Sequence, residues 1–402
     1  MPRLEPFAGL RYDCSRLDLG SVIAPPYDVV DEQERSRLAA RHRANAVHLE
    51  LPQPDRRRGL DRYQHASALL ADWEQSGTLV RDAHPALYPY RMTTPEGRAT
   101  DGVIGALSLD PADTADVLPH EQTLPKPMSD RLDLLRATRA NLSPIWGLSL
   151  SAGLTGRFTV SAPPAATATD DEGVLHELWV LDDPATVTAV SEGIAASPVV
   201  VADGHHRYET ALRYREEVVG IEGGGSGASS IMALVVELSD EQLAVGTFHR
   251  ALSGLPEGLD LVEAFSSWFD VTRAGPADER TLAALAEAAA LALVMPSGAW
   301  LLTPRDGTAE AAGSALDASM VALALAELPD HELEFLPDWH QVGPALGSQR
   351  AQAVVLLRPV TVAQIAAWAR ERRRMPPKTT YFHPKPRTGM VFRTLDIPAG
   401  AR

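Results

Sequence analysis

The sequence of 402 residues predicts a mixed α/β (α+β) protein whose sheets are partly antiparallel. Strand-like runs alternate with segments of helical spacing, but without the regular repeat of a doubly wound parallel sheet. Two strand-like runs, Ala86–Met92 and Gly102–Leu109, flank a short polar segment as in an antiparallel hairpin. Because the chain is longer than one ordinary core requires, we expect two or three domains.

Helical and strand patterns follow one another through the first third of the chain. Asp31-Glu32-Gln33-Glu34 has the pattern of a capping box and predicts a helix over Arg35–Arg43. Apolar spacing predicts a second helix over Asp61–Ser76. Val47–Leu51 alternates between apolar and polar residues, which predicts a half-buried strand. Asp130–Asn141, rich in Leu and Arg, predicts a further helix.

The rest of the chain continues this mixed pattern. Pro184–Ala196 predicts a helix, Pro198–Ala202 a strand and Ile231–Leu238 a buried strand. Later elements are helices around Leu282–Leu293, Leu316–Glu327 and Val362–Arg374, and strands at Val354–Leu357 and Met390–Arg393. We expect an N-terminal α/β domain over 1–181, a middle segment over 182–275 and a C-terminal α/β segment over 276–402.

The charge of the chain disfavours nucleic acid as a partner. Lys and Arg number 37 and Asp and Glu 53, which gives a net charge of −16. Such a charge repels nucleic acid unless a basic patch is segregated. The basic clusters at Arg56–Arg58 and Arg370–Arg374 are interpreted as solvated helix faces. We therefore do not expect nucleic acid as a partner, and a homo-oligomer is left open.

Cysteine use and hydropathy suggest the compartment. Cys14 is the only cysteine, so no intrachain disulfide forms, which fits a reducing cytoplasm. The first six residues contain no apolar signal region. The most apolar stretch, Leu282–Met295, carries Glu287 and is too short to span a bilayer. We expect a soluble cytoplasmic protein with no membrane partner.

The most informative motif is a predicted strand that ends at Asp203-Gly204 and is followed by His205, His206 and Arg207 at the start of a helix. The first turn of a helix presents unpaired N–H groups and the positive end of the macrodipole, so cations are disfavoured there unless an anion neutralises them. The motif therefore predicts a phosphate-binding turn. Gly204 would let the backbone approach the ligand, and Arg207 would grip its oxygens in a bidentate way.

The remaining polar residues of this turn have several possible roles. His205 and His206 point about 100° apart on a helix, so we do not expect them to bind one metal together. One would face the phosphates while the other packs or takes part in acid–base chemistry. Asp203 would either cap the helix or hold Mg²⁺. The structural alternative is a plain capped helix with surface histidines.

The run Asp203–Ala211 resembles the phosphate-binding box of the ParB/sulfiredoxin superfamily. In that superfamily, sulfiredoxins bind ATP through Gly-Cys-His-Arg-Tyr, ParB proteins bind CTP through Gly-Glu-Arg-Arg, and free-serine kinases carry a box close to Asp-Gly-His-His-Arg. The resemblance implies a ParB/sulfiredoxin-like core around the box, with His206 and Arg207 on the nucleotide phosphates. His205 stands where sulfiredoxin has its reactive cysteine, which excludes sulfinic-acid reduction by that thiol.

The chain also resembles, from end to end, a bacterial and archaeal family known only as domain of unknown function 1015. Because the matching motifs are distributed along the whole chain, the chain is identified as a member of this family. The family name indicates no reaction. The motifs that carry this resemblance are Ala24–Val29, His120–Thr123 with Asp130-Arg131, Asn141–Ile145, Asp203–Arg207, Thr247–Arg250 and Met375–Lys385.

A second candidate site is the irregular segment around His120-Glu121, which lies between prolines and near Thr123 and Lys126. A carboxylate beside a transferred phosphate can act as general base on a hydroxyl substrate. Serine kinases of the superfamily use a glutamate in this way, although Glu121 does not align with it by sequence; in this hypothesis Glu121 is the base and His120 lies next to the substrate. The segment lacks the second histidine, four residues on, of the zinc-protease motif. The alternative is a loop salt bridge.

Three further segments carry candidate ligand-binding residues, each with a structural alternative. Arg131, in the first turn of a predicted helix, could reach a substrate carboxylate or only stabilise the helix. Lys378 and Thr379, in a basic and hydroxyl-rich segment, could serve the nucleotide phosphates or belong to an edge strand. His249 and Arg250 follow a strand and could add positive charge at the substrate.

These observations support two main hypotheses and a weaker third. The first is a Mg²⁺-dependent phosphotransferase that uses ATP or ADP on a small hydroxyl metabolite, with free serine as a first example taken from resemblance. The second is a CTP- or ATP-gated binding protein without turnover. The third is a metal-dependent hydrolase. In the first, Glu121, Asp203 and His205 are catalytic, and Gly204, His206, Arg207, Lys378 and Thr379 bind the cofactor.

Overall fold

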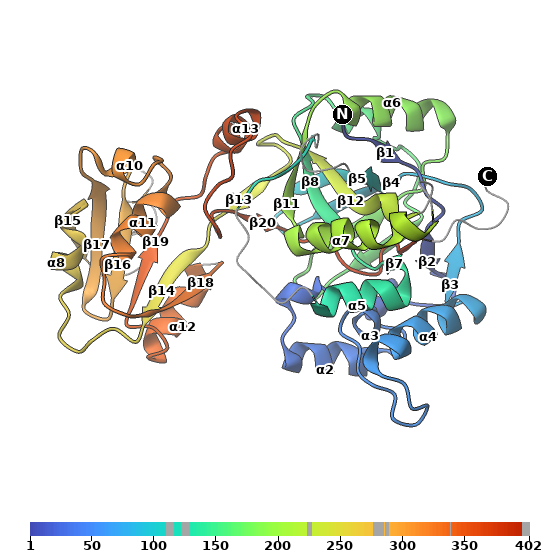
Figure 1. Cartoon of the computed structure of the whole chain (residues 1–402), viewed down its shortest axis with the longest axis horizontal. Coiled ribbons are helices and arrows are strands. Elements are labelled where there is room, and N and C mark those ends of the chain that lie inside the picture. The colour runs from blue at the N-terminus through green and yellow to red at the C-terminus, as the bar shows by residue number, and fades with distance from the viewer. Residues whose placement is uncertain are drawn as a thin grey trace. The chain divides into compact units, whose positions relative to one another are not determined.

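The computed structural model describes residues 1–109, 116–121, 129–222, 227–275, 285, 289–337 and 339–395. They form two compact units, Met1–Leu243 with Pro384–Arg402, and Ala244–His383 (Figure 1). The second unit is inserted in sequence between the body of the first and its C-terminal segment. The expected boundaries at 181/182 and 275/276 lie inside the first and second units, respectively.

A nine-stranded mixed sheet forms the centre of the first unit. Its order is β6-β11-β8-β12-β5-β4-β10-β9, with β1 also paired to β5. The β11–β6 and β12–β8 pairs are parallel and the others antiparallel. The strands of this unit are β1 (Leu4–Glu5), β2 (Leu10–Tyr12), β3 (Leu79–Arg81), β4 (Tyr88–Thr93), β5 (Ala99–Ser108), β6 (Val117–Pro119), β7 (Ala140–Asn141), β8 (Ile145–Ser149), β9 (Ala166–Thr169), β10 (Leu175–Leu178), β11 (Val199–Asp203), β12 (Ser230–Glu237) and β21 (Arg393–Thr394).

Helices pack around this sheet. Helix α7 contacts β8 and β12 and also packs against α5, which in turn contacts α4. The helices are α1 (Leu19–Val22), α2 (Glu32–Arg41), α3 (Val47–Glu50), α4 (Arg62–Gln75), α5 (Ser129–Thr138), α6 (Pro184–Ala195) and α7 (His205–Glu222), with 3₁₀ turns η1 (Tyr27–Val29), η2 (Thr155–Arg157) and η3 (Gly227–Ser229).

The mixed α+β class is confirmed, and so is the β4–β5 hairpin, in which Tyr88 pairs with Ile104. The expected strand at Val47–Leu51 is wrong, because these residues form the short helix α3. Its start is organised by Asn45, whose Oδ1 accepts from the Val47 N–H at 3.0 Å. A side chain that satisfies a first-turn donor favours a helix start over an extended strand.

The main core of the first unit lies between one face of the sheet and helices α6 and α7. Val190 and Ile194 of α6 and Tyr208 and Ala211 of α7 pack there against buried strand residues such as Val201. Burial of apolar surface on this scale is the chief stabilising term of such a layer. It fixes the start of α7 against the end of β11.

The second unit is built on a six-stranded antiparallel sheet of order β15-β17-β16-β19-β14-β18, with β13 and β20 as a separate pair. Its strands are β13 (Ala244–Gly246), β14 (His249–Ser253), β15 (Phe269–Gly275), β16 (Leu291–Met295), β17 (Gly298–Pro304), β18 (Glu332–Leu336), β19 (Ala353–Leu356) and β20 (Tyr381–His383). Its helices are α8 (Leu261–Phe265), α10 (Thr308–Ala311), α11 (Asp317–Leu325), η4 (Trp339–Gln341), α12 (Val342–Gly347) and α13 (Val362–Arg370).

Two expectations at the end of the chain need correction. The helix around Leu282–Leu293 is wrong at its C-terminal end, because Leu291–Met295 is strand β16, paired on both sides by β17 and β19. Most residues from 276 to 288 lie outside the described part. The strand at Met390–Arg393 begins later, as β21 at Arg393. Among the described residues, no helix combines the length and apolar character needed to cross a membrane.

Candidate functional site

The predicted strand–turn–helix is present: β11 ends at Asp203 and α7 begins at His205. Gly204 between them has φ of +87°, a conformation that L residues rarely adopt. A Cβ at this position would also lie 3.0 Å from Ile145 Cγ2 and 3.1 Å from Nε of Arg207. The glycine is thus required by both backbone conformation and close approach.

The start of α7 presents free backbone donors. Its first backbone bond runs from the Tyr208 N–H to the carbonyl of Gly204, at 2.9 Å. The N–H groups of His205, His206 and Arg207 precede that bond and have no intrahelical partner. Together with the positive end of the helix dipole, they form an environment that favours an anion.

Asp203 lies between two cations. Its Oδ1 accepts from Nζ of Lys385 at 2.6 Å, and its Oδ2 accepts from Nη2 of Arg207 at 3.0 Å. Burial alone would raise the pKa of Asp203, but the charges of Lys385 and Arg207 outweigh it and lower the pKa to about 2. Asp28 lies 4.0 Å from the same Lys385 ammonium. Asp203 is therefore ionised at neutral pH and holds both cations at the turn.

Arg207 is fixed by the loop before β8. Its Nη1 donates to Pro144 O at 2.6 Å and to Ser143 Oγ at 3.1 Å. These bonds, with the one to Asp203, use three of the five N–H groups of the guanidinium. The carbonyl and hydroxyl hold the guanidinium plane in one orientation beside the start of α7.

The His120-Glu121 segment and the turn meet in one place. Strand β6 pairs in parallel with β11, which carries residues 120 and 121 to the end of β11. His120 Nδ1 lies 2.6 Å from the carbonyl of Val201 and 3.2 Å from Nε2 of His205, and the two rings are 5.0 Å apart. His120 Nε2 lies 3.1 Å from Oε1 of Glu121. A carboxylate, two imidazoles and the helix start thus share one site.

The hydrogen-bond partners and the burial of these histidines indicate which of their ring nitrogens carry protons. The Val201 carbonyl only accepts, so Nδ1 of His120 carries a proton. Burial, with a further contribution from His120, lowers the pKa of His205 to about 3, so His205 is neutral at pH 7. The site therefore holds a proton acceptor at neutral pH.

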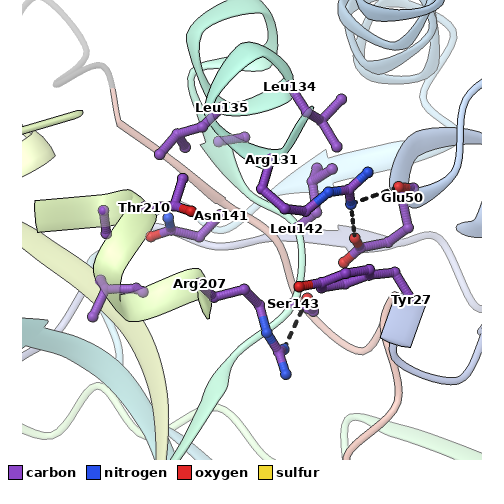
Figure 2. Close-up of a pocket in the computed structure, with 13 residues that line it drawn as sticks. Tyr27, Glu50, Arg131, Leu134, Leu135, Asn141, Leu142, Ser143, Arg207 and Thr210 are labelled. Atoms are coloured by element: carbon purple, nitrogen blue, oxygen red, sulfur yellow. Dashed lines mark hydrogen bonds and ion pairs between the residues drawn. The ribbon is translucent and has the colours of Figure 1, made fainter. Parts of the chain in front are cut away.

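A pocket opens beside Arg207, on the side of α7 that faces α5 (Figure 2). It contains about 460 Å³ of empty space, part of it open to solvent. Its lining combines apolar side chains with a few polar and charged ones. The lining residues are Tyr27, Glu50, Arg131, Leu134, Leu135, Ala140, Asn141, Leu142, Ser143, Arg207, Thr210, Ala211 and Ile231.

Arg131 lies on the side of the pocket that carries Glu50 (Figure 2). Its Nη1 donates to the carbonyl of Glu50 at 2.8 Å and lies 3.3 Å from the Glu50 carboxylate. Its Nε and Nη2 donate to Asp130 at 2.9 and 2.6 Å, and its guanidinium lies 4.4 Å from the centre of the Tyr27 ring. The predicted substrate residue therefore lines a pocket, but most of its donors are already engaged.

Buried polar atoms without hydrogen-bond partners gather at the start of α7. They are His206 Nδ1, Arg207 Nε and Thr210 Oγ1. His206 Nδ1 lies 3.7 Å from the nearest Glu209 oxygen, beyond hydrogen-bond distance. Buried polar groups are normally satisfied, so three unsatisfied atoms within five residues indicate a surface prepared for a ligand or for water.

Four candidate residues belong to the second unit. Arg250 is buried and donates to the carbonyls of Phe248 at 2.6 Å and Lys378 at 3.1 Å. Thr379 donates to Pro376 O at 2.7 Å, and the Lys378 ammonium lies 4.7 Å from the centre of the Phe248 ring. Buried His249 accepts from the Leu357 N–H at 3.3 Å through Nδ1. These contacts stabilise the second unit itself, and a role of these residues toward ligand stays a prediction.

Lys385, Glu50 and Tyr27 are site residues that the sequence reasoning did not assign. Lys385 is the last residue of the Met375–Lys385 motif, and the basic, hydroxyl-rich pattern of that motif does not distinguish it from Lys378, the lysine predicted to bind phosphates. Tyr27 stands in the run Pro25-Pro26-Tyr27-Asp28, a pattern typical of a rigid structural turn. No local pattern marks Glu50, because its contact to Arg131 spans 81 positions. Thr123 and Lys126 lie outside the described residues.

The described residues contain no group of three or more His, Cys, Asp or Glu side chains arranged to hold a metal ion. Both oxygens of Asp203 accept from cations instead. Nothing in this part of the chain therefore favours the metal-dependent hydrolase built from His120, Glu121, Asp203 and His205.

Residues 4–319 match the family model described as "Protein of unknown function (DUF1015)", and the chain belongs to that family. The sequence gives no match to a curated protein.

Three solved structures show a weak likeness to the chain. A conserved hypothetical protein from Pyrococcus furiosus has a TM-score of 0.38 and 14% identity, over 72% of this chain and 93% of that one. A free serine kinase in complex with AMP has 0.37 and 14%, over 70% and 87%. A C-terminally truncated SbnI from Staphylococcus aureus has 0.40 and 12%, over 72% and 86%. We draw no inference from similarity at this level.

Proposed function

We propose that this member of the DUF1015 family is a Mg²⁺-dependent phosphotransferase that moves a phosphoryl group from ATP or ADP to the hydroxyl group of a small metabolite. The observation that carries the proposal is the meeting of Glu121 and His120 with the start of α7, next to His205. An anion-binding helix start and a carboxylate at one site are the two parts that phosphoryl transfer to a hydroxyl needs.

The turn would bind the phosphates of the nucleotide. The N–H groups of residues 205–207, which have no intrahelical partner, would bind the phosphate oxygens, and Gly204 lets the Arg207 guanidinium lie close to the backbone of the turn. Lys385 and Arg207 supply positive charge near developing negative charge on the transferred group. This is the role expected of a ParB/sulfiredoxin-like box, which we assign to Asp203–Arg207 as part of the proposal.

In the proposed step, the acceptor oxygen attacks the terminal phosphorus of the nucleotide. A new P–O bond forms, and the bond from that phosphorus to the bridging oxygen breaks, so that ATP leaves as ADP, or ADP as AMP. Glu121, as carboxylate, takes the proton from the acceptor hydroxyl. His120, whose Nε2 lies 3.1 Å from Oε1 of Glu121, would orient that carboxylate, while neutral His205 would fix the His120 ring.

In this proposal magnesium would enter the site bound to the nucleotide and not on a preformed protein site. Mg²⁺ usually keeps several waters and binds one or two carboxylates together with substrate phosphates. Asp203 is the carboxylate at the turn, and its two oxygens are held by Lys385 and Arg207. When bound, Mg²⁺ would offset charge on the phosphates, and Asp203 would position the two cations around them.

The acceptor class follows only in part from the site. Free serine remains a first example, inherited from resemblance to the superfamily kinases. A cytoplasmic location, where nucleotides are available and Cys14 stays reduced, belongs to the same proposal. The rival function is a nucleotide-gated binding protein, which would bind ATP or CTP at the same turn without turnover.

The test is phosphorus NMR on the full-length protein with Mg²⁺, ATP or ADP, and a pool of free amino acids and small hydroxy acids. A new phosphomonoester signal, lost in Glu121→Gln and Arg207→Ala, is the expected result. Glu216→Gln and Arg213→Ala, exposed positions of α7, serve as matched controls. Nucleotide that binds but stays intact would replace this proposal with the nucleotide-gated protein.

A further inference from the structure

The pocket between α5 and α7 contains hydrogen-bond donors that no protein group uses. Thr210 Oγ1 is buried, its residue only 3% exposed, and has no hydrogen-bond partner. Arg207 Nε, one helical turn earlier, is also buried without a partner. Both residues line the pocket, and Figure 2 shows them on the side opposite Glu50. A helical threonine usually bonds back to a carbonyl of its own helix, so its free hydroxyl here needs an explanation.

Asn141 adds a third donor, and its orientation is fixed. Its Oδ1 accepts from the Met232 N–H at 2.9 Å and from Nη1 of Arg393 at 2.9 Å. Two donors on one oxygen determine which end of the amide is which. The Nδ2 amino group is therefore the end left for the pocket that Asn141 lines.

The charges of the lining residues favour an acidic ligand. Arg131 and Arg207 are the cations of the lining, and Glu50 is its anion. The carboxylate of Glu50 is already engaged, by Arg131 at 3.3 Å and by Thr388 Oγ1 at 3.4 Å. The unused groups are donors, which need an acceptor, and the lining leaves no unengaged carboxylate to receive an ammonium group.

The rest of the pocket sets the size and polarity of that ligand. Leu134, Leu135, Leu142 and Ile231 supply an apolar surface next to the donors. A phosphate would place some of its oxygens against these side chains, where they would lose hydrogen bonds to water. A carboxylate concentrates its two acceptors at one end and leaves a hydrocarbon part for the leucines.

We propose that this pocket is a binding site for the carboxylate of a small organic acid, held by Thr210 Oγ1, Asn141 Nδ2 and Arg207 Nε with its hydrocarbon part against α5. The site is separate from the phosphate-binding turn, although Arg207 borders both. If the proposed phosphotransferase activity is correct, the organic acid is the acceptor of the phosphoryl group. Binding of the acid requires no turnover, so an experiment can contradict either proposal without contradicting the other.

The test is a ligand-observed NMR titration of the full-length protein with butyrate, butyramide and inorganic phosphate. Butyrate should bind at least about tenfold more tightly than butyramide, because hydrogen bonds to a charged acceptor are the stronger ones. Equal binding of butyrate and butyramide would overturn the proposal, and so would phosphate that displaces butyrate from the pocket.

Thr210→Val keeps the shape of the side chain and removes only the hydroxyl. It should weaken butyrate binding about tenfold or more. It should also raise the melting temperature of the ligand-free protein, because it removes an unsatisfied buried group. Thr188→Val on α6, where the hydroxyl donates to Pro184 O, is the matched control and should leave butyrate binding unchanged.

Asn141→Asp gives a second, independent variant because it replaces a donor with a carboxylate. Butyrate binding should fall below detection, while a folded protein is verified by its unfolding transition. Unchanged butyrate affinity in both Thr210→Val and Asn141→Asp would overturn the assignment of the pocket.

Discussion

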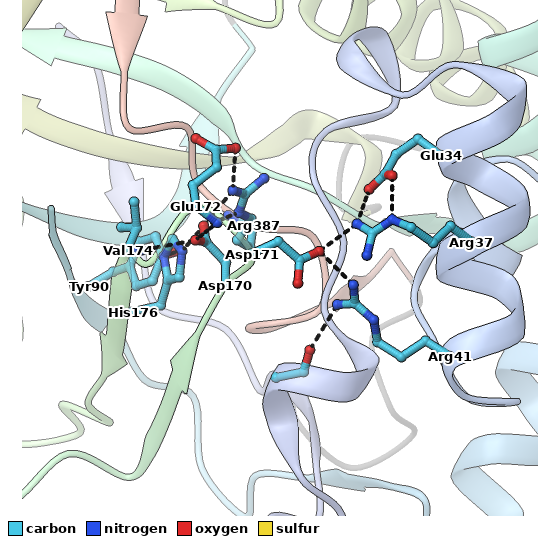
Figure 3. A network of polar contacts seen from close by, with 11 residues as sticks. Glu34, Arg37, Arg41, Tyr90, Asp170, Asp171, Glu172, Val174, His176 and Arg387 are labelled. Atoms are coloured by element: carbon cyan, nitrogen blue, oxygen red, sulfur yellow. Dashed lines mark hydrogen bonds and ion pairs between the residues drawn. The ribbon is translucent and has the colours of Figure 1, made fainter. Parts of the chain in front are cut away.

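Two polar clusters of the first unit differ in how completely their hydrogen bonds are satisfied. One joins Asp170, His176 and Arg387 (Figure 3). The other lies at the start of α7 and its adjoining pocket (Figure 2). Both combine carboxylates, imidazole and guanidinium groups in buried or half-buried positions, so composition alone does not separate them.

The Asp170 cluster is saturated. His176 Nε2 donates to Asp170 Oδ2 at 2.8 Å, and the Tyr90 hydroxyl lies 2.7 Å from His176 Nδ1. Arg387 Nε donates to Asp170 at 2.7 Å and its Nη2 to Glu172 at 2.8 Å. Burial opposes it, but His176 and Arg387 hold the pKa of Asp170 well below its usual range. The cluster ties the C-terminal segment to strands β4 and β10.

The α7 cluster is unsaturated. His206 Nδ1, Arg207 Nε and Thr210 Oγ1 are buried without partners there. A buried polar group without a hydrogen-bond partner lowers the free energy of unfolding by on the order of 1–3 kcal/mol. Unsatisfied polar groups beside a pocket indicate a ligand, whereas a saturated network indicates a structural role. The following predictions test that distinction.

Glu121→Gln should have the largest effect. It removes the proposed proton acceptor without changing the shape of the side chain, so phosphoryl transfer should fall by about 10²–10⁴-fold. Rates from phosphorus NMR measure this, with Glu216→Gln as the exposed control. Transfer within threefold of wild type would remove Glu121 from the reaction.

Arg387→Ala should lower stability rather than activity. It leaves Asp170 buried without its cation, which costs about 3–5 kcal/mol in the free energy of unfolding. Arg37, which also pairs with acidic residues but is 48% exposed in its side chain, gives a control for which Arg37→Ala should cost less than about 1 kcal/mol. Urea unfolding measures both. Equal losses would contradict a structural role specific to the Asp170 cluster.

Gly204→Ala and Gly307→Ala separate backbone strain from crowding. Both glycines have φ of +87°, but only Gly204 has neighbours that a Cβ would meet, while Gly307 has none within 4 Å. Each should lose about 1–2 kcal/mol from the left-handed backbone. Gly204→Ala should lose more, and should also weaken nucleotide binding because it displaces Arg207. Identical effects on stability and binding would show that crowding at the turn is unimportant.

His205 should make stability depend on pH. Its pKa of about 3 in the fold lies below the ordinary value of 6.5, so the unfolded chain binds a proton first as pH falls. The stability it contributes is complete above about pH 6.5 and is lost as pH falls toward 3. Between pH 7 and 5.5, wild type should lose on the order of 1 kcal/mol more than His205→Asn. Parallel stability curves for the two proteins would contradict a buried, neutral His205.

Sequence patterns correctly predicted the helices and turns that are determined by residues close together in the chain. The helix over Asp61–Ser76 is α4, because Asp61 and Gln64 complete a capping box there. The turn at Asp203-Gly204 follows from a β-branched run that meets a glycine. The strand prediction for Val47–Leu51 failed because the Asn45 side chain stabilises a helix start there, despite the two-residue periodicity of the sequence. The same side chain also donates to Ser21 O and Ile23 O.

Long-range contacts were beyond such reasoning. The proximity of His120 to His205 depends on the β6–β11 pairing across about 80 positions. Glu50 and Lys385 reach their partners across 81 and 182 positions. Spacing along the chain carries no information about which of several basic or acidic residues the fold brings to one site.

The most direct measurement of the central claim is a calorimetric titration of the protein with ADP and ATP in the presence of Mg²⁺, on wild type, Arg207→Ala and Arg213→Ala. If the unsaturated turn is the nucleotide site, wild type and Arg213→Ala bind alike and Arg207→Ala binds at least about tenfold more weakly. Equal affinity of all three proteins, or no heat of binding in wild type, would contradict it.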